Sequence, residues 1–208
     1  MSMRLPAEQR RRQLLDVACD VFAASGFYGT SMDDIATAAG VTKPVLYQHF
    51  PSKRALYTEL LEDVGARLLG DMTAAARAAT TGRQRVEEGF GAYFRFVTHN
   101  RAAFRLLFGA SARNDPEFAQ IVDRVLTDAA EAISVLIEID GTEEHRRALA
   151  HALVGIAEST SRHALTDPDA SHDAGELAHW VSELAWFGLR GVRPDAVAER
   201  AARAAHAG

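Results

Sequence analysis

Residues 31–53 read SMDDIATAAGVTKPVLYQHFPSK, and this stretch decides the fold. A short helical pattern ends at Gly40, and a second begins near Thr42, so only a tight turn separates the two predicted helices. Gly40 stands where a left-handed backbone closes a helix most easily, because it has no Cβ. Two short helices joined in this way have the layout of a helix-turn-helix, whose second helix can enter the DNA major groove.

The residues around the turn favour the same layout. Ser31 can cap the first helix, and Asp34, three residues later, can complete the cap and suit the positive helix end. Thr42 can cap the second helix, and Pro44 then falls in its first turn, where a missing N–H costs little. Val45, Leu46 and Phe50 can face inward. The outward residues of this helix are Lys43, Tyr47, Gln48 and His49. Helix pairs with this spacing also occur in proteins that never touch DNA, so spacing alone leaves both interpretations open.

The residues themselves go further than the spacing. From residue 13 to residue 61 the chain resembles the N-terminal domain of the TetR family of bacterial transcriptional regulators. The run LYQHFPSK, residues 46–53, is similar to the most recognisable string of that family. Further matching positions are Leu14, Leu15, Ala18, Phe22, Gly26, Phe27, Thr30, Ile35, Ala36, Ala39, Gly40, Val41 and Leu56. The resemblance implies that this segment binds double-stranded DNA, and it says little about the rest of the chain.

Within this segment we expect a defined set of DNA contacts. The candidate DNA-binding residues are Ser31, Thr42, Lys43, Pro44, Tyr47, Gln48, His49 and Lys53. Hydroxyls and cations suit phosphates, and Gln48 can read an adenine edge or lie at the groove wall. The chain departs from the commonest family string at Pro44, where a smaller residue is usual, and at Gln48, where an aromatic is usual. These departures concern base readout more than docking.

Charge is distributed unevenly along the chain. The net charge is −5, which does not by itself suit a DNA-binding protein. Residues 1–60 hold seven Lys and Arg against six Asp and Glu, whereas the remainder holds 16 against 22. The acidic excess therefore lies outside the proposed DNA-reading segment, and phosphate binding depends on the local patch rather than the total.

The rest of the chain is predicted to be helical. We expect an all-α fold, with a three-helix helix-turn-helix domain in residues 1–52 and a larger helical domain in residues 53–208. No alternating strand pattern persists. The expected helices cover about 7–25, 52 to beyond 69, 86–99, a short piece around 104–108, 114–141, 142–165 and 173–189, with a polar loop at 166–171 and a helical tail after Pro194.

A set of aromatic residues indicates where a ligand site is expected. Each could be ordinary core, but regulators of the TetR type generally carry a ligand pocket in this region, and bulky apolar walls with a few polar groups suit one. The candidate ligand-binding residues are Phe90, Tyr93, Phe94, Phe104, Phe108 and His151. An apolar or acyl-type effector fits this composition.

The last two long helices, about 143–165 and 173–189, read as an interface. Small residues among leucines allow helices to approach closely, although a buried face within one chain would look the same. By resemblance, these helices form a four-helix bundle with a second copy. A homodimer would place two reading helices about 34–36 Å apart, or a multiple of that distance, on a palindrome.

Other function classes find little support. His145 and His151 are six residues apart and share no helix face, so we expect no metal site. We find no nucleophile elbow or phosphate loop, and expect neither enzyme activity nor a cofactor. Cys19, the single cysteine, is expected to be a packing residue, and no apolar run approaches a membrane span, so a cytoplasmic location is expected. The sequence predicts a ligand-responsive repressor that binds palindromic operator DNA as a homodimer and is released by a small, largely apolar ligand. The alternative is a helical small-molecule sensor without operator binding.

Overall fold

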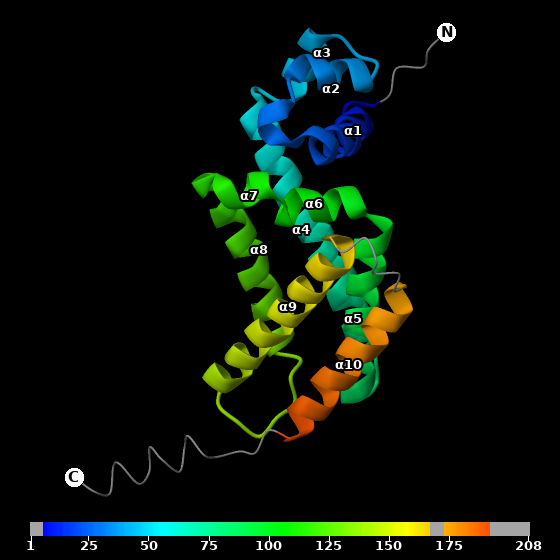
Figure 1. Ribbon diagram of the computed structural model, residues 1–208, viewed down its shortest axis with the longest axis vertical. Coiled ribbons are helices and arrows are strands. Elements are labelled where there is room, and N and C mark those ends of the chain that lie inside the picture. The colour runs from blue at the N-terminus through cyan, green and yellow to red at the C-terminus, as the bar shows by residue number, and fades with distance from the viewer. Residues whose placement is uncertain (1–5, 167–172, 192–208) are drawn as a thin grey trace, which may run out of the picture. The chain divides into compact units, whose positions relative to one another are not determined.

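The computed structural model describes residues 6–166 and 173–191, and within these ranges the chain forms ten α-helices and no strand (Figure 1). The helices are α1 (Ala7–Gly29), α2 (Met32–Ala38), α3 (Lys43–His49), α4 (Lys53–Ala78), α5 (Gly82–His99), α6 (Arg101–Phe108), α7 (Ala110–Asn114), α8 (Pro116–Ser134), α9 (Glu143–Thr166) and α10 (Ala174–Gly191). The predicted all-α fold is confirmed. The polar loop at 167–171 and the tail after Pro194 lie outside the described residues.

The helices group into two compact units that are not consecutive in sequence. The first unit takes the chain up to Arg67 and then His99–Val125, and the second takes Leu68–Thr98 and the chain from Leu126. Helices α4 and α8 therefore each supply residues to both units. A division after residue 52 stays a prediction.

In the first unit, α1 packs against α2, α6 and α7. Its regular part ends at Gly26, whose φ of 71° and ψ of 170° interrupt the helix, close to the end that the sequence predicts. The N–H of Phe27 then donates to the hydroxyl of Ser111 at 3.1 Å. A side chain at position 26 would need an unfavourable backbone conformation and would approach the same hydroxyl to 3.3 Å. Gly26 thus lets α1 turn against the segment that follows α6.

Four aromatic rings form the centre of the first unit. Tyr57 of α4 meets Phe22 edge-on at 4.9 Å between centroids and lies 4.5 Å from Phe118 of α8. The ring of Phe27 contacts Tyr57 and Phe118, with centroid distances of 5.1 and 4.9 Å. Edge-on contacts of this kind add to the burial of apolar surface. They hold α1, α4 and the first turns of α8 together.

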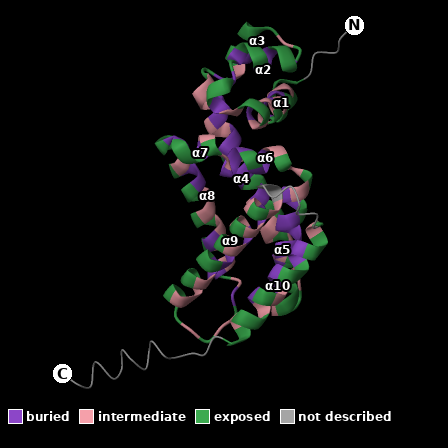
Figure 2. Ribbon diagram, viewed as in Figure 1, coloured by how far each residue is buried: buried purple, intermediate pink, exposed green. Residues whose placement is uncertain are grey.

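The second unit contains α5, α9 and α10, and α9 packs beside α10. Buried residues cluster along α5 from Phe90 to Val97, as Figure 2 shows in purple. The cap that the sequence predicts for α9 is present: the hydroxyl of Thr142 accepts from the N–H of His145 at 3.1 Å. The helix predicted to begin at 114–116 does begin there, because α8 starts at Pro116, but its predicted end near Gly141 is wrong, because α8 ends at Ser134.

Two further predictions concern membrane-spanning helices and the single cysteine. Among the helices described, none is long and apolar enough to cross a membrane. Cys19 is half-buried on α1, and this burial raises the pKa of its thiol to about 11. The free, protonated thiol agrees with the predicted packing role.

Candidate functional site

The start of α2 is fixed by a reciprocal cap. The hydroxyl of Ser31 accepts from the N–H of Asp34 at 3.2 Å, and the Asp34 carboxylate accepts from the N–H of Ser31 at 2.8 Å. The Ser31 hydroxyl also donates to this carboxylate, and these hydrogen bonds lower the pKa of Asp34. The predicted capping box is confirmed. The proton of the Ser31 hydroxyl is therefore directed at Asp34.

The turn between α2 and α3 closes with two backbone hydrogen bonds. Gly40 has a φ of 63°, its N–H donates to the carbonyl of Thr37, and the N–H of Val41 donates to the carbonyl of Ala36. This is the Schellman arrangement, for which glycine is the preferred residue. Thr42 occupies the N-cap position of α3, as the sequence predicts. The expected side-chain cap is wrong, because the Thr42 hydroxyl makes no capping hydrogen bond.

Helix α3 has one buried side and one exposed side. Leu46 is fully buried, and Phe50, which follows the helix, is 1% exposed, as the sequence predicts. The residues exposed on α3 include Lys43, Pro44, Tyr47 and Gln48, and Figure 2 shows this outer side in green. His49 is only half-buried. The exposed set is thus presented by a short helix that its own apolar side anchors.

Arg11 of α1 supports the end of α3. Its guanidinium donates to the carbonyl oxygen of His49 at 2.6 Å and to the carboxylate of Glu59 on α4. It also lies 4.4 Å from the centre of the Phe50 ring. The neighbouring Arg12 donates to Asp63 of α4 at 2.6 Å. These two arginines therefore join α1 to α4, and Arg11 fixes the position of α3.

Lys53 has structural partners that the sequence did not reveal. Its ammonium donates to the carbonyl oxygens of Phe27 and Thr30, at 2.8 and 2.7 Å, and lies 4.5 Å from the centre of the Phe27 ring. Lys43, by contrast, extends from the start of α3 and pairs with Asp33 of α2 at 2.8 Å, where both side chains are exposed. Of the two predicted lysine contacts, only Lys43 stands on the exposed side of α3.

The predicted ligand residues fall into separate groups. In the second unit, Phe90 and Phe94 stack at 6.4 Å, and Tyr93 meets Phe94 edge-on at 5.2 Å. In the first unit, Phe104 and Phe108 of α6 lie 4.7 Å apart. All five aromatic residues are buried. His151 departs from the expectation, because it lies on the exposed side of α9, next to the fully buried Ala150, and not among these rings.

Two family models match the chain. Residues 14–60 match the model described as bacterial regulatory proteins, tetR family, and residues 82–188 match the tetracyclin repressor-like C-terminal domain. The chain belongs to the TetR family. The second match spans α5 to α10, which the resemblance of the DNA-reading segment did not cover.

Curated TetR-family relatives support this assignment. The chain is 39% identical over 189 residues to the HTH-type transcriptional activator FasR of Mycolicibacterium smegmatis, covering 89% of this chain and 85% of the relative. It is 26% identical to the HTH-type transcriptional repressor KstR2 of the same organism, covering 89% of this chain and 80% of the relative. The chain is accordingly a transcriptional regulator of the TetR family.

Solved structures of TetR-family regulators share the fold. A TetR-like transcriptional regulator from Rhodococcus sp. RHA1 has a TM-score of 0.73 and 28% identity, covering 91% of this chain and 100% of that one. FadR of Bacillus subtilis, solved in complex with stearoyl-CoA, has a TM-score of 0.72 and 17% identity, covering 88% of this chain and 99% of that one. At that identity, the second likeness shows the fold alone.

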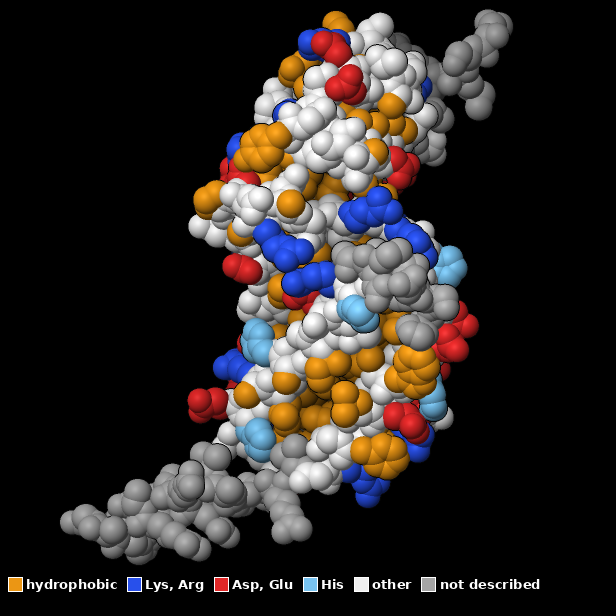
Figure 3. All heavy atoms as spheres, viewed as in Figure 1, with side chains coloured by type: hydrophobic (Ala, Val, Ile, Leu, Met, Phe, Trp, Pro, Cys, Tyr) orange, Lys and Arg blue, Asp and Glu red, His pale blue; other side chains and the backbone are white. Residues whose placement is uncertain are grey.

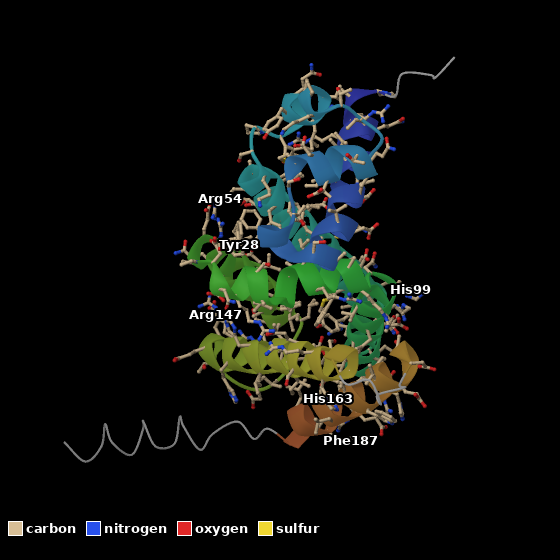
Figure 4. The ribbon with its side chains drawn as sticks, turned by 45° about the horizontal axis from the view of Figure 1, so that its top comes forward. Tyr28, Arg54, His99, Arg147, His163 and Phe187 are labelled. Atoms are coloured by element: carbon tan, nitrogen blue, oxygen red, sulfur yellow. The ribbon has the colours of Figure 1, made fainter. Side chains whose placement is uncertain are left out.

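The second unit carries an exposed apolar surface on the two helices that the sequence predicts to form an interface. Leu184, Phe187 and Trp180 of α10 are 64%, 61% and 49% exposed. On the adjoining α9, Ala152 and Gly155 are exposed as well. Figure 3 shows hydrophobic side chains gathered over these two helices, and Figure 4 labels Phe187 on α10. We call these five residues the α9–α10 face.

A run without acidic residues was missed at the level of sequence. Between Glu88 and Asp115 the chain has no Asp or Glu, although it is acidic overall. In the first unit this run places Arg101 and Arg105 four residues apart on α6, and both are exposed. Counting acids along the chain, and not only cations, is the signal that finds it. Across the described ranges, no group of three or more His, Cys, Asp or Glu could hold a metal ion.

Proposed function

We propose that this TetR-family regulator binds palindromic operator DNA as a homodimer through α3 and is released by a small, largely apolar ligand of the acyl type. The observation that carries the proposal is the exposed set Lys43, Tyr47 and Gln48 on a helix whose position is fixed from behind by Leu46 and Arg11. A reading helix that does not move when it binds loses little conformational entropy.

The exposed residues divide by role. Lys43 contacts a phosphate, Tyr47 and His49 contact the backbone or groove, and Gln48 reads a base edge or lies at the groove wall. Thr42 and Pro44, at the start of α3, lie against the sugar-phosphate backbone of the DNA. The Ser31 hydroxyl and the Lys53 ammonium already have partners within the protein, so we assign them mainly to positioning α2, α3 and α4.

The homodimer forms through the α9–α10 face. Large exposed apolar side chains such as Leu184 and Phe187 are costly in water when they lie together, and such surfaces mark interaction sites. Exposed Ala152 and Gly155 on α9 let a second helix approach closely. A two-fold axis through this face gives two copies of α3, as a palindrome requires.

The ligand belongs to the acyl class. The buried aromatic group of the second unit, Phe90, Tyr93 and Phe94, offers an apolar environment that suits a hydrocarbon chain. FadR of Bacillus subtilis was solved in complex with stearoyl-CoA, which makes this molecule a reasonable first probe for the present protein.

Release from DNA by a ligand is compatible with either activation or repression of transcription. Two relatives are named for opposite senses: FasR is an activator and KstR2 a repressor. We retain repression as the proposed sense. A bound dimer that overlaps a promoter blocks polymerase, and ligand release then restores transcription.

Fluorescence anisotropy with a labelled duplex from the region upstream of the protein's own gene tests the proposal. Wild-type protein should bind this duplex and should dissociate when stearoyl-CoA is added. A Gln48→Ala, Tyr47→Ala variant should fold normally but lose preference for this duplex over a scrambled one. If the protein binds stearoyl-CoA and no DNA, it is the helical sensor of the alternative.

A further inference from the structure

Two buried hydroxyls in the second unit have no hydrogen-bond partner. Tyr93 of α5 is 4% exposed and Ser161 of α9 is fully buried. Neither the phenol oxygen of Tyr93 nor the hydroxyl oxygen of Ser161 makes a hydrogen bond. Buried side-chain polar atoms are nearly always paired, and an unpaired one loses its hydration without compensation. A partner that accepts a hydrogen bond from these hydroxyls would recover this loss.

The two hydroxyls belong to one site. Burial raises the pKa of Tyr93, and the Ser161 hydroxyl, which is close enough to interact but does not have the geometry of a hydrogen bond, opposes that rise. Arg162, the residue after Ser161, and Glu158, about one turn before it on α9, also act on the phenol through their charges, and the two pair with each other. The ring of Tyr93 meets Phe94 edge-on, so the same side chain contacts an aromatic neighbour and carries one of the two hydroxyls.

The chemistry of the site selects one kind of partner. Two hydroxyls that lie close together can both donate to one acceptor oxygen, which satisfies both at once. A carboxylate is disfavoured here, because Arg162, the cation that acts on Tyr93, is balanced by Glu158, and a second anion would leave this cluster with a net negative charge. A neutral carbonyl oxygen accepts two hydrogen bonds and brings no charge into the buried region.

We infer that Tyr93 and Ser161 bind the carbonyl oxygen of a thioester or ester effector whose hydrocarbon chain lies beside Phe90 and Phe94 in the second unit. This inference rests on the proposed function, since it names the group that the acyl-type effector presents to the protein. Tyr93 then acts as a specificity residue: the aromatic rings bind the hydrocarbon chain, and the hydroxyl pair distinguishes an acyl group from an alkyl group.

The stability of the unliganded protein provides the first test. Because the hydroxyl of Tyr93 has no partner there, Tyr93→Phe should leave Tm unchanged or raise it, and Ser161→Ala should do the same. Tyr57→Phe is the matched control, because the Tyr57 hydroxyl donates to the carbonyl of Leu106 at 3.4 Å in the first unit. If the Tyr93 and Ser161 hydroxyls satisfied each other instead, Tyr93→Phe would lower Tm, and that result overturns the inference.

Binding of two probes that differ only in the carbonyl provides the second test. Stearoyl-CoA carries the thioester carbonyl, whereas S-octadecyl-CoA has a methylene in its place. Calorimetry on the full-length protein should show about tenfold tighter binding of stearoyl-CoA, as a pair of buried hydrogen bonds implies. Tyr93→Phe should weaken stearoyl-CoA binding by a similar factor and leave S-octadecyl-CoA binding unchanged, so the two probes become nearly equal. Tyr57→Phe should keep the wild-type preference.

The outcomes separate the inference from the proposed function. If wild-type protein binds both probes equally and each releases it from DNA, the acyl-chain proposal stands and the carbonyl site is refuted. If wild-type protein binds neither probe, the effector class is wrong and the inference fails with it. If Tyr93→Phe lost the same affinity for both probes, the Tyr93 hydroxyl would contribute only to packing, and that result also overturns the inference.

Discussion

The ammonium of Lys53 donates a hydrogen bond to the carbonyl oxygen of Thr30 at 2.7 Å. Thr30 follows α1 and precedes α2, whereas Lys53 is the first residue of α4. A second hydrogen bond to the carbonyl of Phe27 completes the contact. The first residue of α4 thereby holds the connection from which the helix-turn-helix begins.

Lys53→Met should therefore lower the stability of the protein and leave its contacts with DNA phosphates unchanged. The variant leaves two carbonyl oxygens without a charged donor, which should lower the free energy of unfolding by about 1–3 kcal/mol. Urea denaturation followed by circular dichroism measures this change. The dependence of DNA binding on salt should stay that of the wild type, because no phosphate contact is lost. A slope reduced by about one per subunit would instead identify Lys53 as a phosphate ligand.

Lys43 should show the opposite behaviour. Lys43→Ala should leave stability nearly unchanged, since its pair with Asp33 is exposed. It should weaken binding to all duplexes alike and reduce the salt slope by about one per subunit. Asp33→Asn is the matched variant, because it removes the anion that competes with phosphate for Lys43, and it should tighten binding. Anisotropy titrations between about 50 and 200 mM salt measure both slopes. An unchanged slope for Lys43→Ala counts against this contact.

The sequence predicted the local features of the DNA-reading segment because short-range rules govern them. The Ser31–Asp34 cap and the left-handed Gly40 depend on residues within three positions of one another. The role of Lys53 was missed because its partners are 23 and 26 residues away. A lysine beside a reading helix looks the same in sequence whether it meets a phosphate or a carbonyl.

The ligand region was harder to predict, because amphipathic helices do not reveal which neighbour they meet. The aromatic residues from Phe90 to Phe108 were correctly placed in the interior. His151 was not, since its neighbour Ala150 takes the buried side of α9. Tyr93 and Ser161, whose hydroxyls are unpaired, are 68 residues apart in sequence, and only a folded structure brings them close together.

Asp115 should make the protein sensitive to acid. Its buried carboxylate accepts from the Arg54 guanidinium at 2.9 Å and from the N–H groups of Glu117 and Phe118 at the start of α8, near the labelled Arg54 and Tyr28 of Figure 4. These contacts lower the pKa of Asp115 below its ordinary 3.8. A group with a lowered folded pKa stabilises the fold above its unfolded pKa, and this contribution is lost as the pH falls through the folded value.

Asp115→Asn tests this dependence. The amide keeps the size of the side chain but not its charge, so the variant should have a lower Tm than the wild type at pH 7. The difference in Tm should hold down to about pH 4 and shrink below 3.8, as the wild-type carboxylate gains a proton. Thermal melts followed by circular dichroism between about pH 2.5 and about 7 provide the comparison. A difference in Tm independent of pH would assign the effect to packing.

Cys19 should react slowly with alkylating agents. Burial raises the pKa of its thiol to about 11, against about 8.5 for a free cysteine, so little thiolate exists at neutral pH. After the higher nucleophilicity of a more basic thiolate is counted, iodoacetamide should react about 20-fold more slowly than with free cysteine at pH 8. The rate should still climb about tenfold per pH unit at pH 9–10, where free cysteine levels off. Mass spectrometry of timed samples measures it, and a plateau near pH 9 would contradict the raised pKa.

The α9–α10 face should control assembly and, through it, DNA binding. Leu184→Glu and Phe187→Glu place a charge on the most exposed apolar side chains of α10, and a charge buried between two copies is strongly unfavourable. Both variants should be monomeric by light scattering at concentrations where the wild type is a dimer. Val135→Glu is the matched control, because Val135 is 74% exposed but lies just after α8 and outside this face. It should leave the mass unchanged. The monomeric variants should keep their helical content but lose operator affinity by at least about a hundredfold, because each half-site then binds alone. A dimer that survives both substitutions would place the interface elsewhere.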